Sequence, residues 1–131
     1  MREYAKQQTD LRIGFCLDTC HLLASGYDVS SADGLSATMS EVERLLGAEN
    51  VPVIHANDSK GGLGSHLDRH QNIGEGYIGL EGFQRILTHP LLRDKAFILE
   101  TPSDDGNDKR NLETLKTLWR NKTNTVTTTI K

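Results

Sequence analysis

The chain has 131 residues and a formal net charge of -3, with 15 Lys and Arg residues against 18 Asp and Glu residues. This length fits one domain of ordinary size, and the acidic balance excludes a basic nucleic-acid surface spread over the whole chain. No run approaches the about 18 apolar residues of a membrane span, and no apolar signal region begins the chain. The only two cysteines, Cys16 and Cys20, cannot form a disulfide framework, so we expect buried thiols in a cytoplasmic protein with no membrane partner.

Short apolar runs alternate with helical patterns along the chain. The pattern predicts, in order, the end of a helix at 2–8, a strand at 12–17, a polar loop at 25–34, a helix at 36–46, a strand at 51–55, a Gly-rich loop at 57–79, a helix at 80–87, a strand at 96–100 and a helix around 112–119. The Thr-rich tail at 121–131 lacks a helical stripe, and we expect it to be disordered.

Strands that alternate with helices are expected to be parallel and joined by crossover helices. A (β/α)8 barrel needs about 250 residues, so this chain holds about three of its eight strand–helix units. We therefore predict an α/β fold, part of a TIM barrel, over residues 1–120. An open part-barrel would expose the apolar faces of Ile13, Phe15, Val53 and Phe97 and would favour association.

Acidic and imidazole side chains follow all three predicted strands. Asp18 ends the first strand and His21 follows it, His55 ends the second, and Glu100 ends the third, while the long loop carries Asp68 and His70. Barrel enzymes hold their sites at this carboxyl edge, and nitrogen and carboxylate ligands suit zinc. One such residue alone is usually a cap or a loop residue, but three strand ends in a row favour a metal site.

Five segments of the sequence resemble the endonuclease IV family of zinc-dependent apurinic/apyrimidinic endonucleases. They are GFCLDTCH at 14–21, HANDSK at 55–60, GSHLDRH at 64–70, GEG at 74–76 and LETP at 99–102. The resemblance covers nearly the whole chain except the Thr-rich tail, and it corresponds to the C-terminal part of the family's TIM barrel. It implies a DNA-repair nuclease that cuts double-stranded DNA 5′ to abasic sites in base-excision repair.

The resemblance also implies residue roles, with three zinc ions in the complete enzyme. His21, Asp68 and His70 match the three protein ligands of one zinc, so that site is complete in this chain. Asp18, His55 and Glu100 match ligands of a second zinc, whose bridging glutamate has no counterpart here, nor have the two histidines of the third. All six would act in catalysis through bound zinc. Arg69, Lys60 and Ser59 are the expected DNA phosphate contacts.

Two alternatives remain open at this point. Sugar isomerases and epimerases with related barrels also place Asp, Glu and His around a divalent metal; Cys20 beside His21, the loop at 68–70 and the run at 57–60 argue against them. A non-catalytic metal-binding fragment is the second alternative. We expect the isolated chain to be at best weakly active, and a missing N-terminal half or self-association to cover its open edges.

Overall fold

Three short parallel strands form the centre of the molecule. The structure is a computed structural model that describes residues 13–102 and 107–128, with side chains described as far as residue 120. Strand β1 (Cys16–Asp18) pairs with β2 (Val53–His55), and β2 pairs with β5 (Ala96–Ile98), in the order β1-β2-β5. The register aligns Asp18 with His55 and His55 with Ile98, so the three carboxyl ends lie at one edge. The predicted parallel strands are confirmed.

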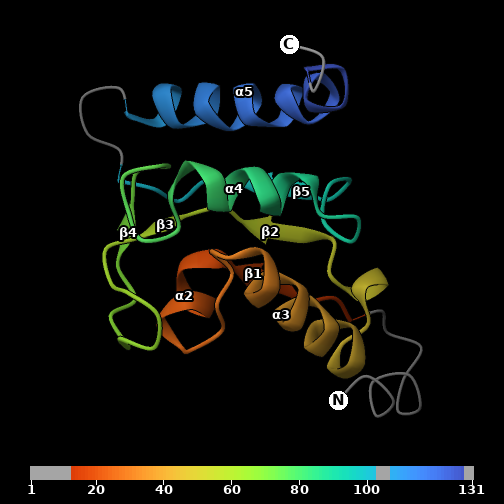
Figure 1. Cartoon of the computed structure of the whole chain (residues 1–131). Helices are drawn as coiled ribbons and strands as arrows, with labels where there is room; N and C mark the ends of the chain where they lie inside the picture. Colours follow the sequence, from red (N-terminus) through yellow and green to blue (C-terminus); the bar gives the residue numbers. More distant parts are fainter. Residues whose placement is uncertain (1–12, 103–106, 129–131) are drawn as a thin grey trace.

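Helices follow each strand, as the alternation predicted (Figure 1). They are α2 (Thr19–Ala24), α3 (Ala32–Leu45), a 3-10 turn (Ala48–Asn50), α4 (Gly79–Thr88) and α5 (Asn107–Thr128). Helix α2 was not predicted, because it has only six residues and starts directly at the end of β1. The Asp18 carboxylate caps it by accepting the His21 N–H at 3.1 Å. The helix predicted at 2–8 lies outside the described residues.

Helix α5 is longer than the helical pattern of the sequence indicates. It continues to Thr128 and so enters the Thr-rich segment at 121–131, for which we predicted disorder. Adding residues to an existing helix costs far less than starting one, which is why a segment without its own apolar stripe can continue it. The division of the chain at residue 120 stays a prediction. Within the described residues, no helix combines the length and apolar character needed to cross a bilayer.

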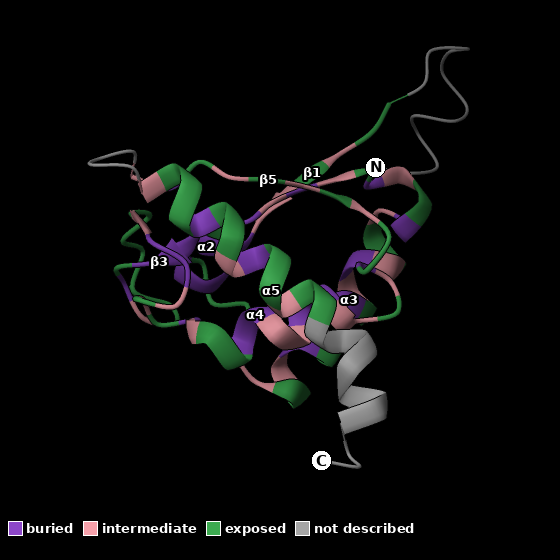
Figure 2. Cartoon of the chain, turned by 90° about the horizontal axis from the view of Figure 1, so that it is seen from above, coloured by how far each residue is buried: buried purple, intermediate pink, exposed green. Residues whose placement is uncertain are grey.

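The central sheet has one covered face and one open face. Figure 2 shows helices α2 to α5 on the same side of the strands, where Leu17, Ile54 and Phe97 join the core and Ile54 is only 1% exposed. The side chains on the opposite face are exposed or half-buried: Cys16, Val53, Ala96 and Ile98. One face of the sheet is open because three strands do not close a barrel interior.

Alternation along the strands also corrects the predicted exposure of single residues. Phe15 and Phe97 are partly buried against the helix-side core rather than exposed. Ile13 is 44% exposed, as predicted, and Ile98 is 46% exposed on the open face. Cys16 is exposed and Cys20 is buried, so the expectation of a buried thiol holds for Cys20 alone.

The long loop at 57–79 is ordered around one buried carboxylate. A small antiparallel sheet pairs β3 (Asp58–Ser59) with β4 (His70–Gln71). Asp58 is fully buried and accepts five backbone N–H groups at 2.8 to 3.1 Å, those of Ser59, Gly74, Gly76, Ile78 and Gly79. Gly76 has to be glycine here, since a Cβ would lie 2.4 Å from the Ser59 carbonyl oxygen. The five bonds fix the segment that carries β4 to the edge of the central sheet.

Candidate metal centre

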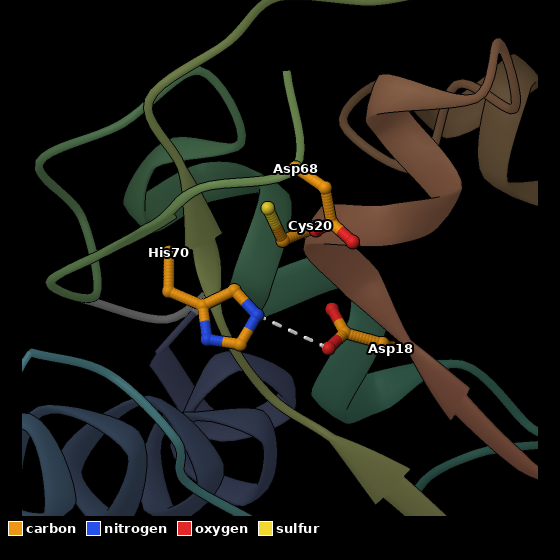
Figure 3. A group of neighbouring side chains, drawn as sticks. All are labelled: Asp18, Cys20, Asp68 and His70. Carbon is orange, nitrogen blue, oxygen red and sulfur yellow. Dashed lines mark ion pairs between the residues drawn. The ribbon is translucent and has the colours of Figure 1, made fainter. Parts of the chain in front are cut away.

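Two groups of potential metal ligands share one edge of the sheet. Asp18, His55 and Glu100 form the first group, and Asp18, Cys20, Asp68 and His70 form the second; in each group the ligand atoms lie within 4.8 Å of one another. Figure 3 shows the four side chains of the second group, with Asp18 at the end of its strand. Carboxylate and imidazole donors at this spacing fit a borderline divalent cation such as zinc.

The first group agrees with the ligand set implied by the sequence resemblance. The His55 Nδ1 is hydrogen-bonded to Glu100 Oε1, and this bond holds the pKa of the Glu100 carboxyl below its usual range. Glu100 lies two residues beyond the last residue of β5, rather than at the strand end that we predicted. The carboxylate is exposed and ionised at neutral pH, as a metal ligand requires.

Asn57 links the Asp18 carboxylate to the backbone of Glu100. Its side-chain N–H donates to Asp18 Oδ2 at 3.3 Å, and its Oδ1 accepts the Glu100 N–H at 2.8 Å. The Asn57 backbone is held by Thr19, whose hydroxyl donates to the Asn57 carbonyl at 2.7 Å. Both residues are buried. Sequence analysis missed this role because Asn57 lies in a polar run that is typical of a solvated loop.

His70 presents one particular ring nitrogen to the second group. Its Nδ1 lies 2.8 Å from the Glu100 carbonyl oxygen, and because a carbonyl only accepts, Nδ1 carries the hydrogen. The other nitrogen, Nε2, lies 3.3 Å from Asp18 Oδ2 (Figure 3). A histidine fixed in this way offers its Nε2 lone pair to a metal.

The second group contains Cys20 where the resemblance implies His21. His21 is not in the second group, although its Nδ1 lies 3.0 Å from Asp68 Oδ2, and this bond lowers the pKa of the Asp68 carboxyl. Cys20 is in the group, fully buried, with its Sγ 3.3 Å from the Arg69 carbonyl oxygen. Burial raises the pKa of the Cys20 thiol to about 11, which opposes the thiolate form that binds metals.

The family model for xylose isomerase-like TIM barrels matches residues 2–121. The chain belongs to this family. Its relatives include a probable endonuclease 4 of Solibacter usitatus, 59% identical over 90% of this chain and 41% of the relative, and one of Halothermothrix orenii, 53% identical over 75% of this chain and 35% of the relative. The predicted resemblance to endonuclease IV is confirmed.

A solved structure supports the same assignment within the family. Endonuclease IV from Thermus thermophilus superposes with a TM-score of 0.75 and 42% sequence identity, over 90% of this chain and 42% of that chain. The predicted TIM-barrel fold is thereby confirmed as a part of a barrel. The chain spans about two fifths of the length of the Solibacter relative and of this solved structure.

The three expected DNA contacts differ in accessibility. Lys60 and Arg69 are exposed and lie directly after β3 and directly before β4, where the Lys60 N–H donates to the Arg69 carbonyl at 2.9 Å. Ser59 is fully buried, and its hydroxyl donates to the Gly61 carbonyl at 2.6 Å. The burial of Ser59 counts against its expected role in DNA binding, because its hydroxyl closes a turn inside the loop. Lys60 and Arg69 remain the candidates.

Proposed function

We propose that this chain forms the zinc-binding part of an endonuclease that hydrolyses the DNA phosphodiester bond 5′ to an abasic site. The observation that carries the proposal is the meeting of two acid–imidazole groups, joined by Asp18, at the carboxyl edge of three parallel barrel strands. The named relatives support the nuclease class. In this proposal Asp18, His55 and Glu100 hold one metal, and Asp68, His70 and His21 hold another.

Residues of this chain would position the metal ligands and bind the DNA phosphates at this edge of the sheet. A divalent metal bound there would supply Lewis acidity and neutralise charge on the phosphoryl oxygens. Asn57 keeps Asp18 and Glu100 at a fixed separation, and the Glu100 carbonyl fixes the ring of His70. Arg69 and Lys60 would bind backbone phosphates beside the ligands, because both are exposed and charged. An abasic nucleotide is the easiest to turn out of the helix, since it has no base to unstack.

The test is incision of a duplex that carries one abasic site by the zinc-loaded chain. We expect slow cleavage 5′ to the lesion that leaves a 3′-hydroxyl, that stops with a chelator, and that Asp18→Asn abolishes. Adding the part of an endonuclease IV that this chain does not match should accelerate incision by orders of magnitude, because that part supplies the remaining zinc ligands implied by the resemblance.

Three outcomes would contradict parts of this proposal. Equal cleavage of an intact duplex would remove the abasic specificity. Incision by the chain alone as fast as by the completed protein would show that further ligands are dispensable. Metal-dependent interconversion of an aldose and a ketose, without any incision, would favour the sugar isomerase alternative, which also fits the family model.

A further inference from the structure

Tyr77 is the most exposed large apolar side chain among the described residues, at 66% exposure. It nevertheless lies on a rigid part of the loop. The Tyr77 N–H donates to the Ser59 carbonyl at 2.9 Å, and the N–H groups on either side, from Gly76 and Ile78, donate to the buried Asp58 carboxylate. An exposed aromatic ring on a fixed backbone is available to stack on a partner.

Tyr77 is one of the residues that line a pocket of about 280 Å³. The other lining residues are Ser59, Lys60, Gln71, Glu75 and Gly76. The ring is supported from behind by Gly62: a Cβ at that position would lie 3.5 Å from the ring carbons Cδ1 and Cε1. An aromatic residue among polar ones fits a ligand that has a planar ring with polar edges.

The position of the pocket connects it to the candidate metal centre. Ser59 lies opposite His70 in the small sheet, so Lys60 and Gln71 each follow a residue of that pair (Figure 1). Arg69 precedes His70 and is bonded through its carbonyl to the Lys60 N–H. Two exposed cations, Lys60 and Arg69, therefore adjoin the Ser59–His70 pair, and Lys60 also lines the pocket.

The charges around the pocket favour an anion-bearing ligand. Lys60 faces the pocket, and the one acidic lining residue, Glu75, lies 3.7 Å from the guanidinium of Arg110. Aromatic stacking combined with basic groups along a backbone is how proteins hold unpaired nucleotides, and each stacked base contributes about 1–3 kcal/mol.

From these observations we infer that Tyr77 and Lys60 form a stacking subsite for one unpaired nucleobase of a DNA strand whose phosphates run past Arg69. The inference rests on the proposed function, and it adds a residue that positions DNA at a distance from the metals. The Tyr77 ring stacks on the base, Lys60 pairs with an adjoining phosphate, and Gln71 lies within the same pocket to bond the edge of the base. Tyr77 is a positioning residue here and takes no part in bond cleavage.

The experiment measures the affinity of the zinc-loaded chain for two fluorescently labelled DNAs, a single strand and a duplex with one abasic site, by anisotropy. Tyr77→Ala should weaken binding to both by about tenfold, as expected for one lost stacked base, while Tyr77→Phe keeps the wild-type affinity. Tyr27→Ala is the matched control, because Tyr27 is also exposed, at 45%, but lies against α3 in a different pocket. It should bind both DNAs as the wild type does.

A second variant separates stacking from charge. Lys60→Gln should reduce the slope of log affinity against log salt by about 0.7–0.9, whereas Tyr77→Ala should leave that slope unchanged. A 2-aminopurine placed opposite the lesion, where the base has no pairing partner, should be quenched by wild type and by Tyr77→Phe but not by Tyr77→Ala.

The outcomes distinguish this inference from the proposed function. A Tyr77 effect without any preference for the abasic duplex supports the subsite and contradicts the proposed specificity. A preference for the abasic duplex that Tyr77→Ala leaves unchanged overturns the subsite alone, and would assign the exposed ring to a protein partner. Wild-type protein that binds neither DNA at low salt overturns both. Each variant should unfold at the wild-type temperature, since neither side chain is buried.

Discussion

Asp58 and Asp68 belong to the same long loop, ten residues apart, and serve opposite purposes. Asp58 is fully buried, and the chain's own backbone supplies five donors to its carboxylate. Asp68 is exposed and belongs to the second ligand group, and its carboxylate is hydrogen-bonded to the imidazole of His21. The backbone donors occupy both oxygens of the Asp58 carboxylate, while the Asp68 carboxylate can still coordinate a metal ion. Two acidic residues of one loop thus differ in role according to whether the chain's own hydrogen-bond donors already occupy the carboxylate oxygens.

The strongest way to break this contrast is to remove the charge of Asp58. In Asp58→Asn the amide nitrogen replaces one carboxylate oxygen and faces at least two backbone donors, which leaves buried N–H groups without an acceptor. We expect a loss of about 4 kcal/mol in unfolding free energy, measured by urea denaturation. Asp94→Asn, at an exposed position, is the control and should change the unfolding free energy little. A stable Asp58→Asn protein would show that the loop is held by other contacts.

The second prediction concerns the zinc that we propose is bound by Asp68 and His70. His70→Ala should remove about one equivalent of zinc, because it deletes the Nε2 donor beside Asp18 and Asp68, as metal analysis of the purified protein would show. His66→Ala is the matched control: His66 is an exposed loop histidine outside both ligand groups. Unchanged zinc content in His70→Ala would contradict the ligand assignment.

A third prediction sharpens the choice between His21 and Cys20 as the remaining ligand. The buried Cys20 thiol donates to the Arg69 carbonyl oxygen at 3.3 Å, and burial raises its pKa to about 11, so the metal-free chain favours the protonated form. We therefore expect Cys20→Ser to keep its zinc and His21→Ala to lose affinity by about tenfold or more. Absorption of the cobalt-substituted protein provides the independent check, since a thiolate ligand would add a charge-transfer band. Such a band would place Cys20 in the site.

The smallest effect is expected at Asp28, a second carboxylate satisfied within its own chain segment. Its side chain accepts from the Ser30 N–H at 2.9 Å and the Ser31 hydroxyl at 2.7 Å, and the hydroxyl bonds of Ser30 and Ser31 lower the pKa of its carboxyl. The folded state thus binds a proton less readily than the unfolded chain. The stabilisation is complete above the unfolded value near 4 and is lost as pH falls through the lower folded value.

Replacing Asp28 with Asn tests this pH dependence. Because the group is largely solvent-screened, we expect a loss below about 1 kcal/mol at pH 7. The difference between Asp28→Asn and wild type should shrink as the pH is lowered from about 5 to about 2 in thermal denaturation. A difference that grows in acid would contradict the assigned direction of the pKa shift.

The same contrast explains what the sequence could predict. Alternating apolar runs define strands and helices, and residues such as Asp18 and His55 directly follow strands, so their convergence is predictable from parallel topology. Ser59 and Asp58 cannot be told from solvated loop residues by their neighbours, because their burial depends on amides up to 21 positions away. Helix α2 and the two-residue strands of the small sheet are too short to leave a periodic pattern. Cys20 and Asp68 lie together because the long loop packs against α2, and the spacing of residues in the sequence does not predict this packing.

The shared acceptor at Asp58 also determines how this part of the protein opens. Five amides that depend on one carboxylate cannot be released one at a time at low cost, because each loss leaves the buried charge less compensated. The segment from Asp58 to Gly79 should therefore behave as a single cooperative unit, closed or open as a whole. Since β4 and the Tyr77 turn both lie within that unit, His70 and the aromatic ring would leave and return to the sheet edge together. Metal binding at His70 would then be coupled to the order of the pocket beside it, with no direct contact between the two.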